Sequence, residues 1–289
     1  MLWPEPPRIL SEQLHAPPEP LALLLRAGPD APAAAVCARA ARAVLDLPPV
    51  ESFQAPPWLA PHQVPAVRRL LGILETYGGA LLADAVGLGK SYVALAVAQM
   101  RAEPFGLIVP AVLTSQWRDL LARLHLDCPI LSHETLSHRS IGPSDCPSVR
   151  LWLVDEAHRF RNPATKRYHH LARLVVGTRT LLVTATPVHN RIADLFHLFR
   201  LFLRDHSLTG LGVPSLRLAA LGQVPDHTLV TVSARLSVAR SRVRVDRGYG
   251  SGPLALAFPS RSPGQVIRAP AVPLADLSQL VAGIRRIEL

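Results

Sequence analysis

The sequence predicts an α/β fold in which a mainly parallel sheet carries helices on both faces. Three short motifs support this prediction, because each directly follows an apolar run that is typical of a buried strand. The motifs are DAVGLGKS at 84–91, DEAH at 155–158 and TATP at 184–187. Around them the chain alternates short apolar runs with longer helical patterns, and this alternation is typical of parallel sheets that are covered by helices.

The expected elements follow from these patterns in chain order. We expect strands near 79–83, 106–110, 128–132, 150–154 and 180–184. We expect helices near 62–75, 90–101, 115–125, 166–175 and 191–204. The last of these helices is apolar on nearly every side, so it should be buried or cover a partner. Asn190 directly precedes this helix and is a good N-cap residue.

Three regions divide the chain. Residues 1–57 are rich in Pro and Ala and form an N-terminal extension with one expected helix at 31–45. Residues 58–205 contain the alternating strands and helices and are expected to form one domain. Residues 206–289 carry many Gly, Pro and Ser residues with weak periodicity, so we expect irregular structure there, or the partial end of the preceding domain.

The motif DAVGLGKS has the pattern of a phosphate-binding loop. Gly87 and Gly89 allow the backbone to turn so that its N–H groups point inward, and a helix beginning near Lys90 adds the positive end of its dipole. Lys90 would reach the β- and γ-phosphates of a nucleotide, and the Ser91 hydroxyl would ligate Mg²⁺. Asp84 stands where the standard pattern has its first glycine, so the loop alone is also compatible with a structural strand–helix turn.

The use of basic residues strengthens the interpretation of this loop. The chain contains two lysines, Lys90 and Lys166, against 29 arginines. A chain that rarely uses lysine has therefore placed one of its two lysines at the position that contacts phosphate.

Asp155 and Glu156 follow the apolar run at 151–154. In a site that hydrolyses nucleotides, the first carboxylate of such a pair holds Mg²⁺ through water, and the second orients and deprotonates the attacking water. Alone, the pair would favour an ordinary acidic N-cap, and His158 alone would more often make an ordinary polar contact than a functional one. Because ligands bind at the carboxyl ends of the strands in open parallel sheets, the three motifs should meet at one edge.

Together the motifs resemble those of the Swi/Snf-type ATPases of helicase superfamily two, which are similar to DEAD/DEAH-box helicases. The resemblance covers about 58–205. Its further segments are PHQ at 61–63, LIVP at 107–110, SQW at 115–117, SHETL at 132–136 and TATPVHN at 184–190. It implies an N-terminal RecA-like lobe that binds ATP and Mg²⁺ and acts on double-stranded DNA. A weaker likeness continues to about residue 268 through 240–247 and 258–261.

The resemblance also implies roles for individual residues. Gln63 would read adenine. Three residues would couple the state of ATP to the grip on DNA: His158, Thr184 and Thr186. Four residues would face the DNA backbone: Ser115, Gln116, Trp117 and Thr135. For Trp117, a position in the apolar core is an equally good interpretation.

Two departures from the family pattern affect these expectations. Ala85 stands where the family usually has Glu. Residues 206–289 contain no second set of strand–helix units and no QxxGRxxR-like string, so motifs IV to VI and the arginine finger of a second RecA-like lobe are not found there. We therefore expect a single lobe that is incomplete and hydrolyses ATP weakly by itself, with a second lobe supplied in trans as one possible partner. The sequence leaves open whether the chain is full-length, split or truncated.

Composition limits the class of protein. The net charge of +10 and the pI of about 10.6 permit binding to nucleic acid, although the arginines are scattered along the chain. No apolar run approaches 18 residues and the start has no signal-peptide pattern, so we expect neither a membrane span nor secretion. Three widely spaced cysteines fit reduced thiols in a bacterial-type cytosol or nucleoid.

The interpretation favoured by these observations is the ATP-binding lobe of a DNA-dependent translocase. An alternative is a non-catalytic nucleotide- or DNA-binding module that remains after loss of the second lobe. A third candidate is another enzyme with a phosphate loop, such as a kinase; the TATP motif and the lack of an acceptor-site motif argue against it.

Overall fold

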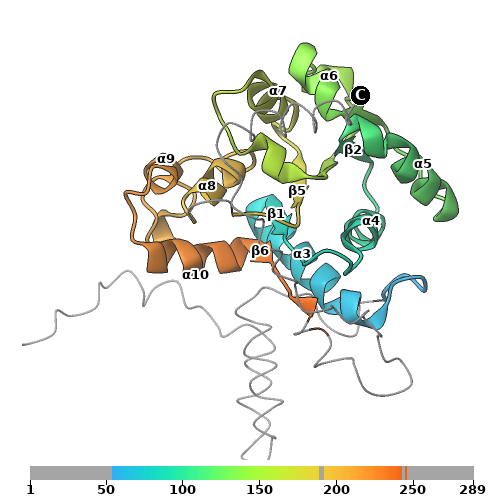
Figure 1. Cartoon of the computed structure of the whole chain (residues 1–289), viewed down its shortest axis with the longest axis horizontal. Coiled ribbons are helices and arrows are strands. Elements are labelled where there is room, and N and C mark those ends of the chain that lie inside the picture. Colours follow the sequence, from blue (N-terminus) through green and yellow to red (C-terminus); the bar gives the residue numbers. More distant parts are fainter. Residues whose placement is uncertain (1–53, 189–191, 243–244, 246–289) are drawn as a thin grey trace, which may run out of the picture. The chain divides into compact units, whose positions relative to one another are not determined.

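The computed structural model describes residues 54–188, 192–242 and 245. All five expected strands are present as β1 (Gly79–Leu82), β2 (Phe105–Val109), β3 (Ile130–Ser132), β4 (Leu151–Val154) and β5 (Arg179–Val183). A short β6 (Ser237–Val238) joins them in one six-stranded sheet of order β3-β2-β4-β5-β1-β6 (Figure 1). Every neighbouring pair in this order is parallel, which confirms the predicted α/β class.

The expected helices are present with shifted ends. They are α3 (Val64–Tyr77), α4 (Lys90–Arg101), α5 (Thr114–Arg123), α7 (Lys166–Leu174) and α8 (Asp194–Phe199). The last helix is shorter than the pattern at 191–204 suggested, but its apolar side chains are buried as expected. The expected N-cap Asn190 and the expected helix at 31–45 lie outside the described residues.

The two faces of the sheet carry two separate apolar cores because successive side chains of a strand point to opposite faces. In β4, Trp152 and Val154 belong to one core, whereas Leu151 and Leu153 belong to the other. The first core also receives α7 and α8, and the second receives α3, α4 and α5. Helices therefore cover both faces of the sheet, as predicted.

Part of the segment for which irregular structure was expected is regular. Residues after 205 form α9 (Leu216–Ala220), α10 (Asp226–Leu236) and the sixth strand. The helix α10 buries Leu229, Val232 and Leu236 in the core that contains α8. Frequent Gly and Pro residues hid this periodicity in the sequence. A third helix that the sequence patterns did not predict is α6 (His133–His138), which begins after the N-cap Ser132.

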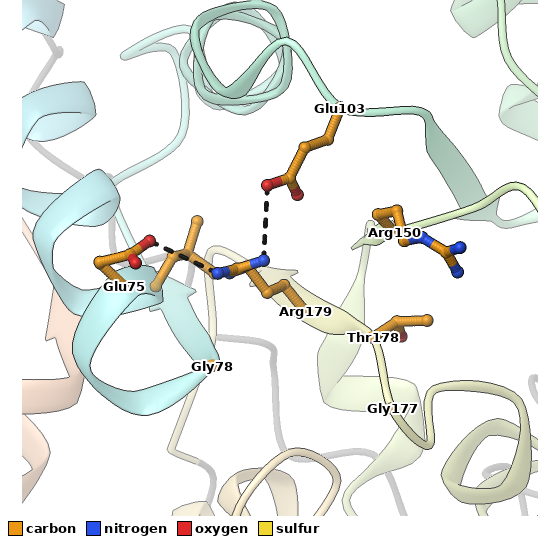
Figure 2. A pocket seen from close by; sticks show the side chains of 8 residues that line it. Glu75, Gly78, Glu103, Arg150, Gly177, Thr178 and Arg179 are labelled. Atoms are coloured by element: carbon orange, nitrogen blue, oxygen red, sulfur yellow. Dashed lines mark hydrogen bonds and ion pairs between the residues drawn. The ribbon is translucent and has the colours of Figure 1, made fainter.

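The amino ends of the strands are linked by a small ionic cluster. Arg179, the first residue of β5, lies between the carboxylates of Glu75 and Glu103, at 3.5 and 3.4 Å (Figure 2). Arg101 pairs with the same two carboxylates, at 3.1 and 2.9 Å. The cluster therefore lies at the amino ends of the strands, whereas the three motifs were expected to meet at the carboxyl ends.

None of the helices in the described part of the chain is both long and apolar enough to cross a membrane.

Candidate functional site

The phosphate loop joins β1 to α4, as the sequence predicted. Gly87 and Gly89 have φ angles of +86° and +73°, in the left-handed region that side chains with a Cβ rarely adopt. The helix α4 begins at Lys90, directly after the loop. The Lys90 ammonium donates a hydrogen bond to the backbone oxygen of Asp84 at 3.0 Å, so its charge lies back over the loop.

The Lys90 charge lies in a partly buried environment that contains several carboxylates. Burial lowers the pKa of Lys90 from its usual value, while the nearby carboxylates of Glu156, Asp84 and Asp155 act in the opposite direction. The loop therefore brings a partly desolvated cation close to both residues of the DE pair. Electrostatic attraction between such a cation and a phosphate is stronger than it would be in bulk water.

Asp155 follows β4 and is fixed from three sides. Its backbone N–H donates to the oxygen of Ile108 at 2.9 Å. Its carboxylate accepts hydrogen bonds from the indole N–H of Trp117 at 3.0 Å and from the backbone N–H of Glu156 at 2.9 Å. Burial raises the pKa of Asp155, and these two hydrogen bonds lower it in part. The carboxylate is thus held in one orientation beside the phosphate loop.

Glu156 begins a chain of polar contacts that reaches the TATP motif. Its carboxylate lies 3.1 Å from Nδ1 of His158, and the same nitrogen lies 3.1 Å from the hydroxyl of Thr184. Thr184 is buried, and its hydroxyl accepts a hydrogen bond from the backbone N–H of Thr186 at 3.2 Å. The predicted coupling residues are therefore contiguous in space, although they come from two separate loops.

The oxygen ligands expected for Mg²⁺ lie near this site. The Ser91 hydroxyl is in the first turn of α4, and the Asp155 carboxylate follows β4. Mg²⁺ in nucleotide sites takes one or two protein oxygens and completes its shell with water and phosphate oxygens. Within the described residues no group of three or more His, Cys, Asp or Glu residues is arranged to hold a metal ion. The residues present therefore suit Mg²⁺ bound together with a nucleotide.

The side chain of Gln63, which was expected to read adenine, contacts the phosphate loop. Its side-chain oxygen accepts from the backbone N–H of Ala60 at 3.0 Å. Its amide nitrogen donates to the backbone oxygens of Leu88 and Gly89, at 3.1 and 3.4 Å. Both ends of the buried side chain are thus used within the protein, so reading a base would require this side chain to exchange partners.

The residues expected to face DNA fall into two groups. Ser115 and Gln116 are exposed at the start of α5 and can contact a partner. Trp117 is 4% exposed and packs in the core, which is the other of the two positions that the sequence left open for it. Successive residues of α5 point in different directions around the helix axis. Ser115 and Gln116 therefore point outward, whereas Trp117 points inward to the sheet and to Asp155. Thr135 is half-buried, and its hydroxyl is 2.9 Å from that of Ser132.

Sequence analysis assigned no role of their own to two residues near the site, although both lie in segments that it quoted. The buried imidazole of His133 contacts the backbone oxygen of Asp155 through Nε2 at 3.0 Å, and burial lowers its pKa to about 4. Arg240 reaches the carboxylate of Asp84 from the far end of the described chain. The replacement of a loop glycine by Asp84 was the one available signal, because a buried carboxylate requires a partner.

Comparisons with known proteins agree with these observations. Residues 124–210 match the model of the SNF2-related domain. The chain is 33% identical over 190 residues to an uncharacterized ATP-dependent helicase, YqhH, of Bacillus subtilis, covering 56% of this chain and 33% of that protein. It is 27% identical over 175 residues to the chromodomain-helicase-DNA-binding protein 1-like of Danio rerio, covering 48% of this chain and 17% of that protein. The chain thus spans a third or less of the length of these curated relatives.

A solved structure shares the fold. The Sulfolobus solfataricus SWI2/SNF2 ATPase core in complex with dsDNA aligns with a TM-score of 0.51 at 18% identity, over 67% of this chain and 46% of that chain. The family model and the curated relatives show that this chain is related to SNF2-type helicases, and the solved structure shows that it shares the fold of a SWI2/SNF2 ATPase core.

Proposed function

We propose that this chain binds ATP with Mg²⁺ and serves as the ATP-binding lobe of a DNA-dependent translocase. The observation that carries the proposal is the polar path from Glu156 through His158 to Thr184, which begins beside the phosphate loop. A site for nucleotide binding alone needs the loop but not this path. A motor needs it, because the state of the nucleotide must reach the surface that holds DNA.

Each residue has a role that its surroundings support. The N–H groups of the loop and the Lys90 ammonium bind the phosphates. Ser91 and Asp155 would hold Mg²⁺, which neutralises charge on the phosphate oxygens and orients them. Glu156 orients the attacking water and accepts its proton. His158 lies within hydrogen-bond distance of both Glu156 and Thr184, so a shift of one can be passed to the other.

The proposed partner is double-stranded DNA. Ser115 and Gln116 are exposed polar residues at the start of α5, and the chain has a net charge of +10. Hydroxyl and amide side chains at the start of a helix are typical contacts to backbone phosphates. The Sulfolobus solfataricus ATPase core, whose structure was solved in complex with dsDNA, supports the same partner. A location in the cytosol or nucleoid follows from this role.

The proposal includes a second lobe. The chain spans a third or less of the length of the two curated relatives named above, and the motifs of a second lobe were not found in its sequence. In phosphoryl transfer, an arginine from a facing element contributes about 10³ to 10⁵ in rate in the related GTPase case. We therefore expect slow hydrolysis of ATP by this chain alone and rapid, DNA-stimulated hydrolysis after a second lobe is added.

The decisive experiment measures phosphate release by the purified chain with and without duplex DNA, and with and without a separately expressed second lobe. Binding of ATP·Mg²⁺, little turnover alone and DNA-stimulated turnover with the second lobe would support the proposal. Absence of ATP binding would contradict the nucleotide site. Rapid DNA-stimulated turnover by the chain alone would contradict the dependence on a second lobe. ATP binding without turnover under any of these conditions would favour the non-catalytic alternative.

A further inference from the structure

We infer that Arg240 is a positioning residue for the phosphate loop and acts through Asp84. The inference rests on the proposed function, since it concerns how the loop is held for nucleotide. Arg240 lies 156 residues after Asp84 and beyond the segment in which the nucleotide motifs occur.

The carboxylate of Asp84 creates the need for a partner. It is fully buried at the end of β1, at the position where a standard loop has glycine. A buried carboxylate without hydrogen-bond donors is strongly unfavourable. Arg240 supplies three donors: its backbone N–H at 2.9 Å, its Nε at 3.1 Å and its Nη2. One residue therefore satisfies both oxygens of the carboxylate, in the two-pronged geometry that only a guanidinium provides.

The backbone around Arg240 holds the next residues of the loop. The pairing of β1 with β6 continues past the ends of the strands, because the N–H of Ala85 donates to the oxygen of Arg240 at 2.9 Å. Arg242 then donates from Nε to the backbone oxygen of Val86 at 2.8 Å. Its guanidinium lies so close to Gly87 that an added Cβ there would come within 2.5 Å of Nη2. Each of residues 84 to 86 is thus bonded to 240 or 242.

Two further contacts connect this arrangement to the groups that would bind nucleotide. The oxygen of Asp84 accepts the hydrogen bond from Lys90, so displacement of Asp84 displaces the ammonium. Arg240 also donates from Nη1 to the oxygen of His62. The next residue, Gln63, donates to the carbonyls of Leu88 and Gly89 in the second half of the loop. Arg240 therefore contacts the segments that fix both halves of the loop.

This arrangement predicts an effect on nucleotide affinity beyond any effect on stability. A phosphate cradle binds tightly when its N–H groups are already aligned, since no ordering is then required on binding. If Arg240 aligns the loop, its loss should weaken nucleotide binding even at temperatures where the protein is fully folded. A purely structural ion pair would lower the unfolding midpoint and leave the affinity of the folded protein unchanged.

The test is a double-mutant cycle on the full chain, with ADP·Mg²⁺ affinity measured by calorimetry and folding checked by circular dichroism. Arg240→Gln should weaken binding by at least about tenfold, or about 1.4 kcal/mol. In the background of Asp84→Asn, where no buried charge needs pairing, the same change should cost less than about threefold. Arg240→Lys keeps the charge but loses the two-pronged contact, and should bind about three- to tenfold more weakly than the parent.

Two controls separate this inference from the proposed function. Arg179→Gln removes an arginine that also pairs with two carboxylates (Figure 2), but at the amino ends of the strands, and should leave affinity unchanged. Lys90→Ala tests the nucleotide site itself.

If the parent and Lys90→Ala bind nucleotide equally, or if neither binds it, the proposed function fails. If Lys90→Ala weakens binding and Arg240→Lys does not, the positioning role is overturned, and this holds even if Arg240→Gln fails to fold. If Arg240→Gln weakens nucleotide binding equally in the parent and in the Asp84→Asn background, the action through Asp84 is overturned.

Discussion

The indole N–H of Trp117 donates a hydrogen bond to the carboxylate of Asp155 at 3.0 Å. This contact joins the start of α5, where Ser115 and Gln116 are exposed, to the residue proposed to hold Mg²⁺. Trp117 therefore has two roles. Its ring fills the core, and its indole N–H orients the Asp155 carboxylate of the site.

Replacing Trp117 by Phe should move the pH dependence of Mg²⁺ binding. Burial already raises the pKa of Asp155, and the indole hydrogen bond opposes this shift. Without the donor the pKa rises further, so a higher pH is needed to ionise the carboxylate. The pH of half-maximal Mg²⁺-dependent nucleotide binding should therefore increase. Titration of binding against pH measures this; well above both midpoints the variant and the parent should bind about equally, and an unchanged midpoint would show that the contact does not tune Asp155.

Lys90→Ala should weaken ATP and ADP binding by at least about tenfold, because it removes the cation directed at the phosphates. The chain offers a matched control in Lys166, its other lysine, which is exposed at the start of α7. Lys166→Ala should bind nucleotide like the parent. Calorimetry with both variants gives the comparison, and equal affinity of Lys90→Ala and the parent would falsify the site.

Glu156→Gln should retain ATP binding and lose hydrolysis, measured in the presence of a second lobe. The amide is close in size to the carboxylate but cannot accept a proton from water. Glu134→Gln is a suitable control, since Glu134 is an exposed carboxylate that caps a nearby backbone N–H, that of Ala111. Loss of binding with unchanged residual turnover in Glu156→Gln would mean that the roles of the carboxylates are assigned incorrectly.

The buried His133 should make the protein less stable as the pH falls. Its pKa is about 4 in the folded state against about 6.5 in the unfolded chain, so the unfolded state binds more protons between these values. The free energy of unfolding therefore decreases from about pH 6.5 toward pH 4, by at most about 3 kcal/mol from this residue. The pKa of His62 is also lowered by burial and acts with the same sign.

Urea unfolding at several pH values tests this expectation. His133→Gln removes the titrating group and should flatten the dependence, although it also loses the ring contact with Phe160 and lowers stability at neutral pH. His138→Gln, at an exposed position of the same helix, should keep the slope of the parent. An unchanged slope in His133→Gln would assign the acid sensitivity to other groups.

Duplex DNA should bind weakly, without sequence preference and with strong dependence on salt, because contacts to phosphates release counterions. Fluorescence anisotropy between about 50 and 200 mM salt measures the slope. Gln116→Ala should weaken binding to all duplexes to a similar extent. Affinity that is independent of salt, or that favours one sequence strongly, would contradict the translocase proposal.

The strands and the phosphate loop were predictable because their signals are local. Each short apolar run is bounded by polar, Gly or Pro residues, and the strands lie within about two residues of the expected positions. The helices were less well defined at their ends, where packing rather than propensity decides the boundary. The short α6 and α9 depend on side-chain caps, from Ser132 and Ser215, that have little weight in a scan for periodicity.

The contacts within the site were less predictable, because they join residues that are distant in sequence. The sequence placed Gln63 and Trp117 near the site through a resemblance, but the direction of each side chain depends on its neighbours. Leu88 and Gly89 engage the amide of Gln63, and Asp155 engages the indole of Trp117. The pairing of Asp84 with Arg240 was visible only as an anomaly in a glycine pattern, with nothing in the local sequence to indicate the partner.

The position of β6 beside β1 also has a consequence for the order of folding during synthesis. The central strands can pair as they leave the ribosome, but β1 receives its second neighbour only after residue 238 is made. Until then the first half of the phosphate loop lacks the residues that bond to it, and contacts between such distant segments form slowly. The nascent chain should therefore acquire affinity for nucleotide late, after most of the sheet has already formed.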